Sequence, residues 1–162
     1  MIIRAIDILF SMILIVLFLP FGLVLALALR LTGEGKIFYF QPRVGFQGKI
    51  FRLAKFATML ENSPNLGTGD ITLKGDPRVL PLGKFLRKTK INEIPQVLNL
   101  LKGDMTLVGP RPLTPRNFAL YPERIKEEIV KVRPGLTGVG SIIFRDEESI
   151  LAKSSKSYLE AY

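Results

Sequence analysis

The sequence predicts an α+β, mainly helical fold in which a small polar domain is seated on a membrane by its first thirty residues. A chain of 162 residues is long enough for one domain and short for two. Its apolar residues gather in one run, Ile8 to Leu29, and the remainder is polar and basic, with turn signals between short helix and strand candidates. We therefore divide the chain into a membrane-embedded segment, residues 1–32, and a single cytosolic domain, residues 33–162.

The apolar run is long enough to cross a bilayer. Between Ile8 and Leu29 only Ser11, Pro20 and Gly22 are not strongly apolar, and roughly 20 apolar residues suffice to cross the hydrocarbon core. A cleaved signal peptide fits poorly, because the run is too long and no small-residue cleavage site follows it. A buried core helix is disfavoured, because the rest of the chain is too small to wrap it. The run therefore predicts a helix inserted in a membrane.

The residues alone leave two topologies open for this helix. Arg4 precedes the run and Arg30, Lys36 and Arg43 follow it, so the flanking charges give no clear orientation. Pro20 removes a backbone donor near the middle and predicts a kink. A proline-broken, re-entrant helix that enters and leaves on one face agrees with these facts. A kinked helix that spans the membrane also agrees, because proline is tolerated there.

Short elements follow in the polar domain. Asn92 is suited to cap a helix that has Pro95 in its first turn and stops at the turn signal Lys102-Gly103-Asp104. The predicted elements are, in order, an extended stretch Lys36–Gln41, a turn Pro42–Gly48, a strand or strand-to-helix segment Lys49–Met59, a mobile surface loop Asn62–Gly75, a basic helix Leu82–Lys88, the helix from Asn92 to about Leu101, a strand Met105–Val108 and an amphipathic helix Glu123–Val132.

Composition narrows the chemistry. The chain has no cysteine and no histidine, which excludes disulfides, thiol nucleophiles, histidine bases and the common zinc sites. Its 23 basic and 14 acidic residues give a net charge of +9, suited to nucleic acid, anionic lipid or phosphorylated small molecules. Any reaction must use carboxylates, lysine, arginine, hydroxyls or backbone amides. A metal would be a hard, oxygen-liking cation such as Mg²⁺, or Mn²⁺ in its place.

Three features are candidates for a site. Asn92 and Glu93 lie at a predicted helix start, where free amides favour anions, although, taken alone, a cap followed by a first-turn glutamate is the better interpretation. Arg111 is held in the stiff Gly109-Pro-Arg-Pro112 loop, which suits bidentate phosphate binding or a purely structural turn. Further cations lie near turns and element ends, where each taken alone is most often solvated surface: Arg78, Arg87, Lys88 and Arg133.

Several motifs occur together in one order over nearly the whole chain. The central ones are Asp76-Pro-Arg-Val79, Phe85-Leu-Arg-Lys-Thr89, Asn92-Glu-Ile-Pro-Gln96, Asn99-Leu-Leu-Lys-Gly-Asp-Met105 and Val108-Gly-Pro-Arg-Pro112, and the flanking ones are Phe40-Gln-Pro-Arg-Val-Gly45, Lys55-Phe-Ala-Thr-Met59 and Val132-Arg-Pro-Gly-Leu-Thr-Gly138. In this combination the chain resembles the bacterial sugar transferases, the monotopic phosphoglycosyl transferases that begin polysaccharide and glycan assembly.

The resemblance implies a membrane step of bacterial polysaccharide synthesis. Such enzymes move a sugar 1-phosphate from a nucleoside diphosphate sugar, usually a uridine one, to polyprenyl (undecaprenyl) phosphate, and they use Mg²⁺. It implies a re-entrant helix broken at Pro20 and a catalytic domain on the cytoplasmic face of the inner membrane. It also implies that Glu93 binds the metal. The residues it implies for binding phosphates are Arg87, Arg111, Arg133, Lys55 and Arg78.

The chain departs from the family pattern at the nucleophile. The family's attacking aspartate falls on Asn92, and an amide cannot form the acyl phosphate that this chemistry needs. Ala57 also replaces a basic residue of the family signature, and the chain stops at Tyr162, short of an amphipathic stretch that many members carry. Asp146, or less favourably Glu147, is then a substitute nucleophile or base, or else part of a solvated, charged helix start.

Two rival functions remain. A non-catalytic relative would still bind nucleotide-sugar or lipid phosphate, and Asn92 supports it. A nucleic-acid-binding protein rests on the +9 charge alone, lacks a recognisable binding motif and is disfavoured by the membrane segment, so we expect no nucleic acid partner. The expected partners are the sugar nucleotide, the lipid phosphate, membrane lipid and, as an open alternative, further copies of the chain.

Overall fold

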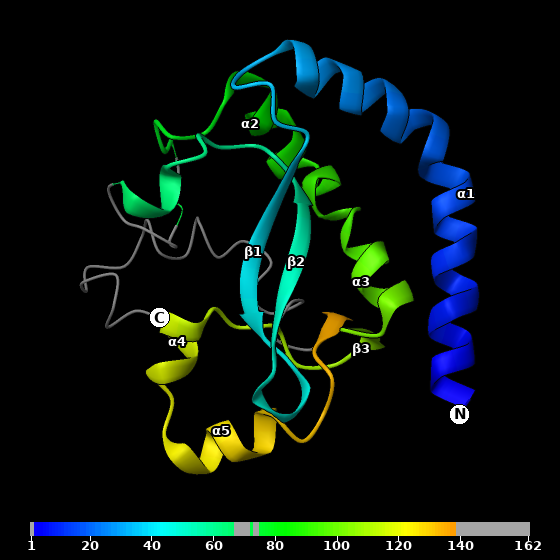
Figure 1. Cartoon of the computed structure of the whole chain (residues 1–162), viewed down its shortest axis with the longest axis vertical. Helices are drawn as coiled ribbons and strands as arrows, with labels where there is room; N and C mark the ends of the chain where they lie inside the picture. The colour runs from blue at the N-terminus through cyan, green and yellow to red at the C-terminus, as the bar shows by residue number, and fades with distance from the viewer. Residues whose placement is uncertain (1, 67–71, 73–74, 139–162) are drawn as a thin grey trace.

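The computed structural model describes residues 2–66, 72 and 75–138 (Figure 1). In the described residues, helices outweigh two small two-stranded sheets, which agrees with a mainly helical α+β fold. The elements are α1 (Ile2–Leu31), β1 (Phe38–Val44), the 3-10 turn η1 (Phe46–Gly48), β2 (Ile50–Phe56), η2 (Ser63–Asn65), α2 (Pro81–Lys88), η3 (Ile91–Glu93), α3 (Gln96–Lys102), β3 (Thr106–Val108), α4 (Pro115–Ala119), α5 (Glu123–Ile129) and β4 (Gly135–Thr137).

Helix α1 is the long apolar element that the sequence predicts. It extends beyond the apolar run at both ends, and its ribbon bends near the middle while it follows the outside of the domain (Figure 1). Pro20 lies inside it and supplies the cause, since proline removes one helical hydrogen bond and clashes with the preceding turn. Large apolar side chains in its middle, such as Val16, Leu17 and Leu23, are exposed. Among the described residues it is the one helix whose length and composition would allow it to cross a membrane.

A polar stripe attaches the start of α1 to the domain. Arg4, Asp7 and Ser11 are three and four residues apart and so lie on one helix face. The Arg4 guanidinium donates to the carbonyl oxygens of the last turn of α3, at 2.6 Å (Leu100) and 2.5 Å (Leu101). That position also suits a cation electrostatically, because a helix carboxyl end carries partial negative charge.

Asp7 completes this attachment. Its side chain is 1% exposed, and its carboxylate accepts hydrogen bonds from the Leu107 amide at 3.0 Å and the Thr106 hydroxyl at 3.0 and 3.1 Å. Ser11 is fully buried and donates to the Asp7 carbonyl oxygen at 2.6 Å. A buried carboxylate on an apolar helix is tolerated only when it is hydrogen-bonded in this way. The first turns of α1 are therefore docked on β3.

The far end of α1 is attached by apolar packing. Leu25 and Leu29 are buried against Phe56 of β2 and Leu86 of α2, and this cluster is one of two hydrophobic cores in the described residues. The other core joins β2 to α3 and β3 through the buried side chains of Phe51, Leu53, Leu100 and Met105. Both ends of α1 thus contact the same domain.

Strands β1 and β2 form an antiparallel hairpin, with Phe38 opposite Phe56 and Val44 opposite Ile50. The segment 49–59 is therefore mainly strand. The predicted turn Pro42–Gly48 is confirmed in its second half, where the chain reverses at η1, and wrong in its first half, where Pro42 lies inside β1. Pro42 costs the hairpin no hydrogen bond. The Val44 amide points away from β2 and donates to the Leu113 carbonyl oxygen. Backbone nitrogens two residues apart on a strand point the same way, so the nitrogen of Pro42 also points away from β2.

The predicted helices are present, with one correction. Helix α2 covers the predicted basic helix, and α3 ends at Gly103, whose φ of 91° suits a glycine at a helix end. Helix α3 begins at Gln96 rather than at Asn92, which lies in η3 and makes no cap hydrogen bond. The physical reason is the hydrogen-bond pattern: Pro95 has no amide to donate, and the amides of Ile94 and Val97 donate three residues back, so the chain forms tight turns before α3. Asn99 on α3 then binds β2, accepting from the Ala54 amide and donating to the Arg52 carbonyl oxygen.

The carboxyl-terminal part of the described chain forms a small parallel pair. Strand β3 agrees with the predicted strand, and it pairs in parallel with β4, with Thr106 opposite Gly135. Helix α5 is shorter than the predicted amphipathic helix and ends at Ile129. Of the predicted surface loop 62–75, the structure describes 62–66, 72 and 75, and Ser63 within η2 is buried.

Candidate functional site

Lys55 on β2 identifies the place where the predicted site residues meet. Its side chain is partly buried, and burial lowers the pKa of the ammonium group from 10.5 to about 8. The carboxylate of Glu93 opposes this shift, while the charges of Arg43, Arg87 and Arg111 reinforce it. Glu93 and the three arginines therefore lie within electrostatic reach of Lys55. Four of these five residues are ones that the sequence assigned to one site.

Glu93 is the carboxylate of this group. It ends η3 and is partly buried, and among the charges that act on Lys55 it is the acidic one. The described residues contain no cluster of three or more side chains that could hold a metal ion by themselves. Mg²⁺ is commonly bound through one or two carboxylates together with substrate phosphates and water. Glu93 therefore fits a magnesium ion that arrives with a phosphorylated substrate.

Arg87 reaches the site from the last turn of α2. A Cβ atom on Gly83, one turn earlier, would lie 2.2 Å from the Thr58 carbonyl oxygen, so α2 rests directly on the backbone that continues β2. The Arg87 guanidinium extends along that backbone, with Nη1 3.7 Å from the sulfur of Met59. The glycine therefore brings Arg87 close to the strand that carries Lys55.

Arg111 lies in the loop after β3, beside the segment that carries Arg133. A Cβ atom on Gly109 would lie 2.5 Å from the Arg133 carbonyl oxygen, and the Gly135 amide donates to the Pro110 carbonyl oxygen at 2.9 Å. Both arginine side chains are exposed. Arg111 acts on Lys55, whereas Arg133 is not among the charges that shift its pKa. The structure thus brings the two loops together but places only Arg111 in the Lys55 group.

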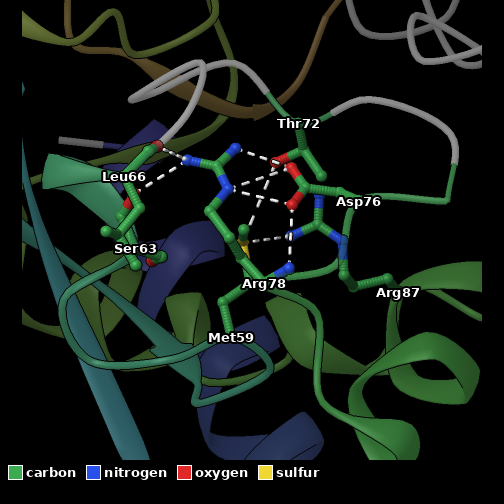
Figure 2. Close-up of polar contacts among 7 residues, drawn as sticks. All are labelled: Met59, Ser63, Leu66, Thr72, Asp76, Arg78 and Arg87. Atoms are coloured by element: carbon green, nitrogen blue, oxygen red, sulfur yellow. Dashed lines mark hydrogen bonds and ion pairs between the residues drawn. The ribbon is translucent and has the colours of Figure 1, made fainter.

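Arg78 is buried in an ion pair, whereas its predicted phosphate-binding role requires a guanidinium that can reach a substrate. It is 5% exposed, and its guanidinium binds the Asp76 carboxylate, with Nη2 2.6 Å from Oδ2 (Figure 2). Nη1 donates to the carbonyl oxygens of Ser63 and Leu66. Hydrogen bonding to Asp76 raises the pKa of Arg78 above its ordinary value. The prediction is corrected, because a guanidinium used in this way stabilises the loop and does not face a phosphate.

Asn92 is buried beside Glu93. It is 4% exposed, and its Oδ1 atom has no hydrogen-bond partner among the described residues. A carboxamide cannot form an acyl phosphate, so Asn92 cannot act as the attacking carboxylate that the resemblance places at this position. Asp146, the predicted substitute, and Glu147 lie outside the described residues.

Arg43 was not among the predicted site residues, although it lies in a motif of the family, and its charge acts on Lys55. It is partly buried on β1, Nη1 donates to the Pro112 carbonyl oxygen at 2.7 Å, and Nη2 donates to Gln41 at 2.6 Å. It therefore ties the hairpin to the loop that carries Arg111. The signal was present in the Phe40-Gln-Pro-Arg-Val-Gly45 motif, where the arginine follows a proline in an otherwise apolar strand.

The pKa of Lys55 predicts a pH-dependent affinity for anions. Protonated Lys55 attracts a diphosphate, so the affinity for uridine diphosphate should fall as the pH rises above about 8, by up to tenfold per pH unit. The phosphate itself is fully ionised by then. Titration calorimetry between pH 7 and 10 measures this. Lys55→Arg should flatten the profile, because arginine stays protonated; an unchanged slope in that variant would assign the titration to another group.

The lowered pKa of Lys55 also affects the free energy of unfolding, which rises with pH where the affinity for anions falls. The unfolded chain holds a proton on Lys55 up to about pH 10.5, while the folded chain loses it near pH 8. The unfolded state therefore binds more protons in that window, and this group makes the folded state more stable as the pH rises through it.

Comparisons with known proteins give sequence matches over most of the chain. A family model described as bacterial sugar transferase matches residues 1–161. The chain is 37% identical over 144 residues to an undecaprenyl-phosphate glucose phosphotransferase of Komagataeibacter xylinus, covering 86% of this chain and 27% of the relative. It is 38% identical over 143 residues to a UDP-glucose:undecaprenyl-phosphate glucose-1-phosphate transferase of Caulobacter vibrioides, covering 86% and 52%.

A shorter relative is matched over more of its length. The exopolysaccharide production protein ExoY of Sinorhizobium fredii is 32% identical over 160 residues, which cover 90% of this chain and 70% of that protein. The chain otherwise spans between about a quarter and a half of the curated relatives named above.

Proposed function

Because the chain belongs to the bacterial sugar transferase family, we propose that it transfers a sugar 1-phosphate from a uridine diphosphate sugar to undecaprenyl phosphate. The observation that carries the proposal is the group of cations, Lys55, Arg87 and Arg111, around the single carboxylate of Glu93. Such a group suits a substrate with several negative charges and a metal ion. The apolar helix α1 beside it suits an acceptor that resides in a membrane.

The reaction exchanges one phosphorus–oxygen bond for another. The bond between the sugar-linked phosphorus and the uridine monophosphate oxygen breaks, and the nucleotide leaves with the electron pair. A new bond joins that phosphorus to an oxygen of the lipid phosphate, either directly or after a carboxylate has carried the phosphosugar. The arginines and Lys55 hold the phosphates and stabilise the charge that develops on their oxygens. Mg²⁺, held by Glu93 together with the diphosphate, would neutralise part of that charge.

Asn92 supports a second candidate, a relative that binds nucleotide-sugar or lipid phosphate without turning it over. Its amide cannot accept the phosphosugar covalently, and it is buried. The two candidates differ in one measurement. Membranes containing the chain are incubated with Mg²⁺, undecaprenyl phosphate and a panel of radiolabelled uridine sugars, and labelled lipid is extracted. Labelled lipid with release of uridine monophosphate supports the transferase, whereas binding without release supports the second candidate.

We further propose that α1 is re-entrant and that the domain lies on the cytoplasmic face. Both ends of α1 contact one domain: Arg4 and Asp7 bind α3 and β3, and Leu25 and Leu29 pack on β2 and α2. A helix that spans the membrane would place these ends on opposite faces. A helix bent at Pro20 can bury its exposed apolar middle in the bilayer and return to the same surface.

Cysteine labelling tests this topology in a chain that has no cysteine of its own. Single cysteines at positions 2 and 36 should both react with a membrane-impermeant maleimide only after the inner membrane is opened. Pro20→Leu should straighten α1, separate Asp7 from β3 and expose position 2 to the periplasm. Labelling of position 2 in intact spheroplasts of the unaltered helix would contradict the re-entrant arrangement.

A further inference from the structure

Asp76 and Arg78 form a buried ion pair before α2. Both side chains are less than a tenth exposed, and four hydrogen bonds join them: from the Arg78 backbone amide to Oδ1, from Nε to both carboxylate oxygens and from Nη2 to Oδ2. A buried ion pair offsets its desolvation only when its geometry is this complete. The pair is thus a rigid unit at the start of the segment that leads into α2.

This unit fixes a short antiparallel crossing next to β2. The Leu60 amide donates to the Arg78 carbonyl oxygen at 3.0 Å, the Leu80 amide donates to the Thr58 carbonyl oxygen at 3.0 Å, and Met59 pairs with Val79 between them. Residues 58–60 directly follow the strand that carries Lys55. The buried pair therefore holds Met59 at a set place relative to Lys55.

The Arg87 side chain packs against Met59. The Arg87 guanidinium contacts the Met59 sulfur at 3.7 Å, and in Figure 2 this side chain extends from α2 toward Met59 and Asp76. The charge of the same guanidinium acts on Lys55. A chain of contacts thus runs from the Asp76–Arg78 pair through Met59 to Arg87, and it ends at the Lys55 group.

We propose that Asp76 and Arg78 are positioning residues that direct Arg87 toward the diphosphate of the substrate. A guanidinium on a long side chain has many rotamers, and holding it in one of them increases its affinity for a phosphate. The inference rests on the proposed function for the identity of the substrate. The positioning role itself depends only on the binding of a diphosphate beside Lys55, whatever the rest of the substrate is.

A double-mutant cycle tests the coupling, with inorganic pyrophosphate as the probe and the full-length protein in detergent. Asp76→Asn and Arg87→Ala should each weaken pyrophosphate binding about tenfold, because each removes the contribution of the same guanidinium. The double variant should be no weaker than Arg87→Ala alone. Additive losses in the cycle, or unchanged affinity in folded Asp76→Asn, would show that the pair only stabilises the loop.

Met59→Ala covers the outcome in which Asp76→Asn does not fold. Met59 is partly exposed, so this variant keeps the ion pair and removes the sulfur that contacts Arg87, together with its contact to the Thr72 hydroxyl. It should weaken pyrophosphate binding to a similar extent, and wild-type affinity would overturn the proposed route. Glu123→Gln is the matched control: it breaks the exposed pair with Lys126 and should leave binding unchanged.

The proposed function and this inference fail in different ways. A wild-type protein that binds pyrophosphate but transfers no phosphosugar contradicts the function and leaves the cycle valid. A wild-type protein that transfers phosphosugar while the cycle is additive contradicts the positioning role alone. Absence of pyrophosphate binding by the wild type overturns both.

Discussion

Glu93→Gln is expected to lower the rate of phosphosugar transfer on the order of 10³-fold, about 4 kcal/mol in the activation free energy. The reason is that an amide oxygen binds Mg²⁺ far more weakly than a carboxylate, and Glu93 is the acidic member of the group around Lys55. Chelation of the wild type with EDTA should have the same effect, and Mg²⁺ or Mn²⁺ should restore activity. Release of uridine monophosphate measures the rate.

A second readout separates the metal role from general damage. Glu93 raises the pKa of Lys55, so its neutralisation should lower that pKa and move the loss of uridine diphosphate affinity to lower pH. Glu123→Gln removes a carboxylate from an exposed ion pair and should retain full activity. Full activity of Glu93→Gln in Mg²⁺ would remove this residue from the site.

Gly135→Ala is expected to destabilise the fold by about 3 kcal/mol, at the upper end of the range for overpacking. A Cβ atom at this position would lie 2.1 Å from the Gly109 nitrogen, 2.5 Å from the Thr137 carbonyl oxygen and 2.7 Å from the Gly109 Cα. All three are backbone atoms, which cannot turn away as a flexible side chain can. The variant should also separate the loops of Arg111 and Arg133, so the folded fraction should bind uridine diphosphate more weakly.

Gly22→Ala is the matched control for this substitution. Apart from its chain neighbours and the adjacent backbone of α1 itself, nothing lies within 4 Å of a Cβ built on Gly22, which is inside α1. Alanine should leave the fold unchanged or stabilise α1 slightly, since alanine is the better helix former. Thermal unfolding in detergent, followed by circular dichroism, compares the two variants. Equal unfolding temperatures would show that the contact of β4 with Gly109 is not tight in solution.

The sequence alone determined the elements whose signals are local. The apolar run predicted α1, and Pro20 predicted a kink in it, because membrane length and proline geometry are properties of the segment itself. The basic helix at α2 and the strand at β3 followed from turn residues on either side of short periodic stretches. The absence of cysteine and histidine restricted the chemistry before any contact was known.

Tertiary structure decided which cations belong to the site. Arg78 and Arg87 both lie near turns in family motifs, and the local difference, Asp76 two residues before Arg78, does not tell whether that pair is buried. Arg78 is buried against Asp76, while Arg87 acts on Lys55. Arg43 joined the site because β1 lies beside the Pro112 loop, a contact between residues 69 positions apart. The fate of a long cationic side chain depends on which distant backbone it meets, and that information is not in its neighbours along the chain.

The start of α1 shows the same division. In the sequence, Arg4 was interpreted as a flanking charge and Ser11 as an exception in an apolar run, and Asp7 was not interpreted. The structure gives Arg4 and Asp7 partners on α3 and β3 about a hundred residues away, and Ser11 donates to the Asp7 carbonyl oxygen. The hydropathy of an apolar helix shows only that its side chains favour leaving water. It does not show which part of the protein the ends of the helix contact. Arg4 binds carbonyl oxygens that are free because α3 ends there, and Asp7 binds the Leu107 amide of β3. Only the fold as a whole brings these groups next to the start of α1.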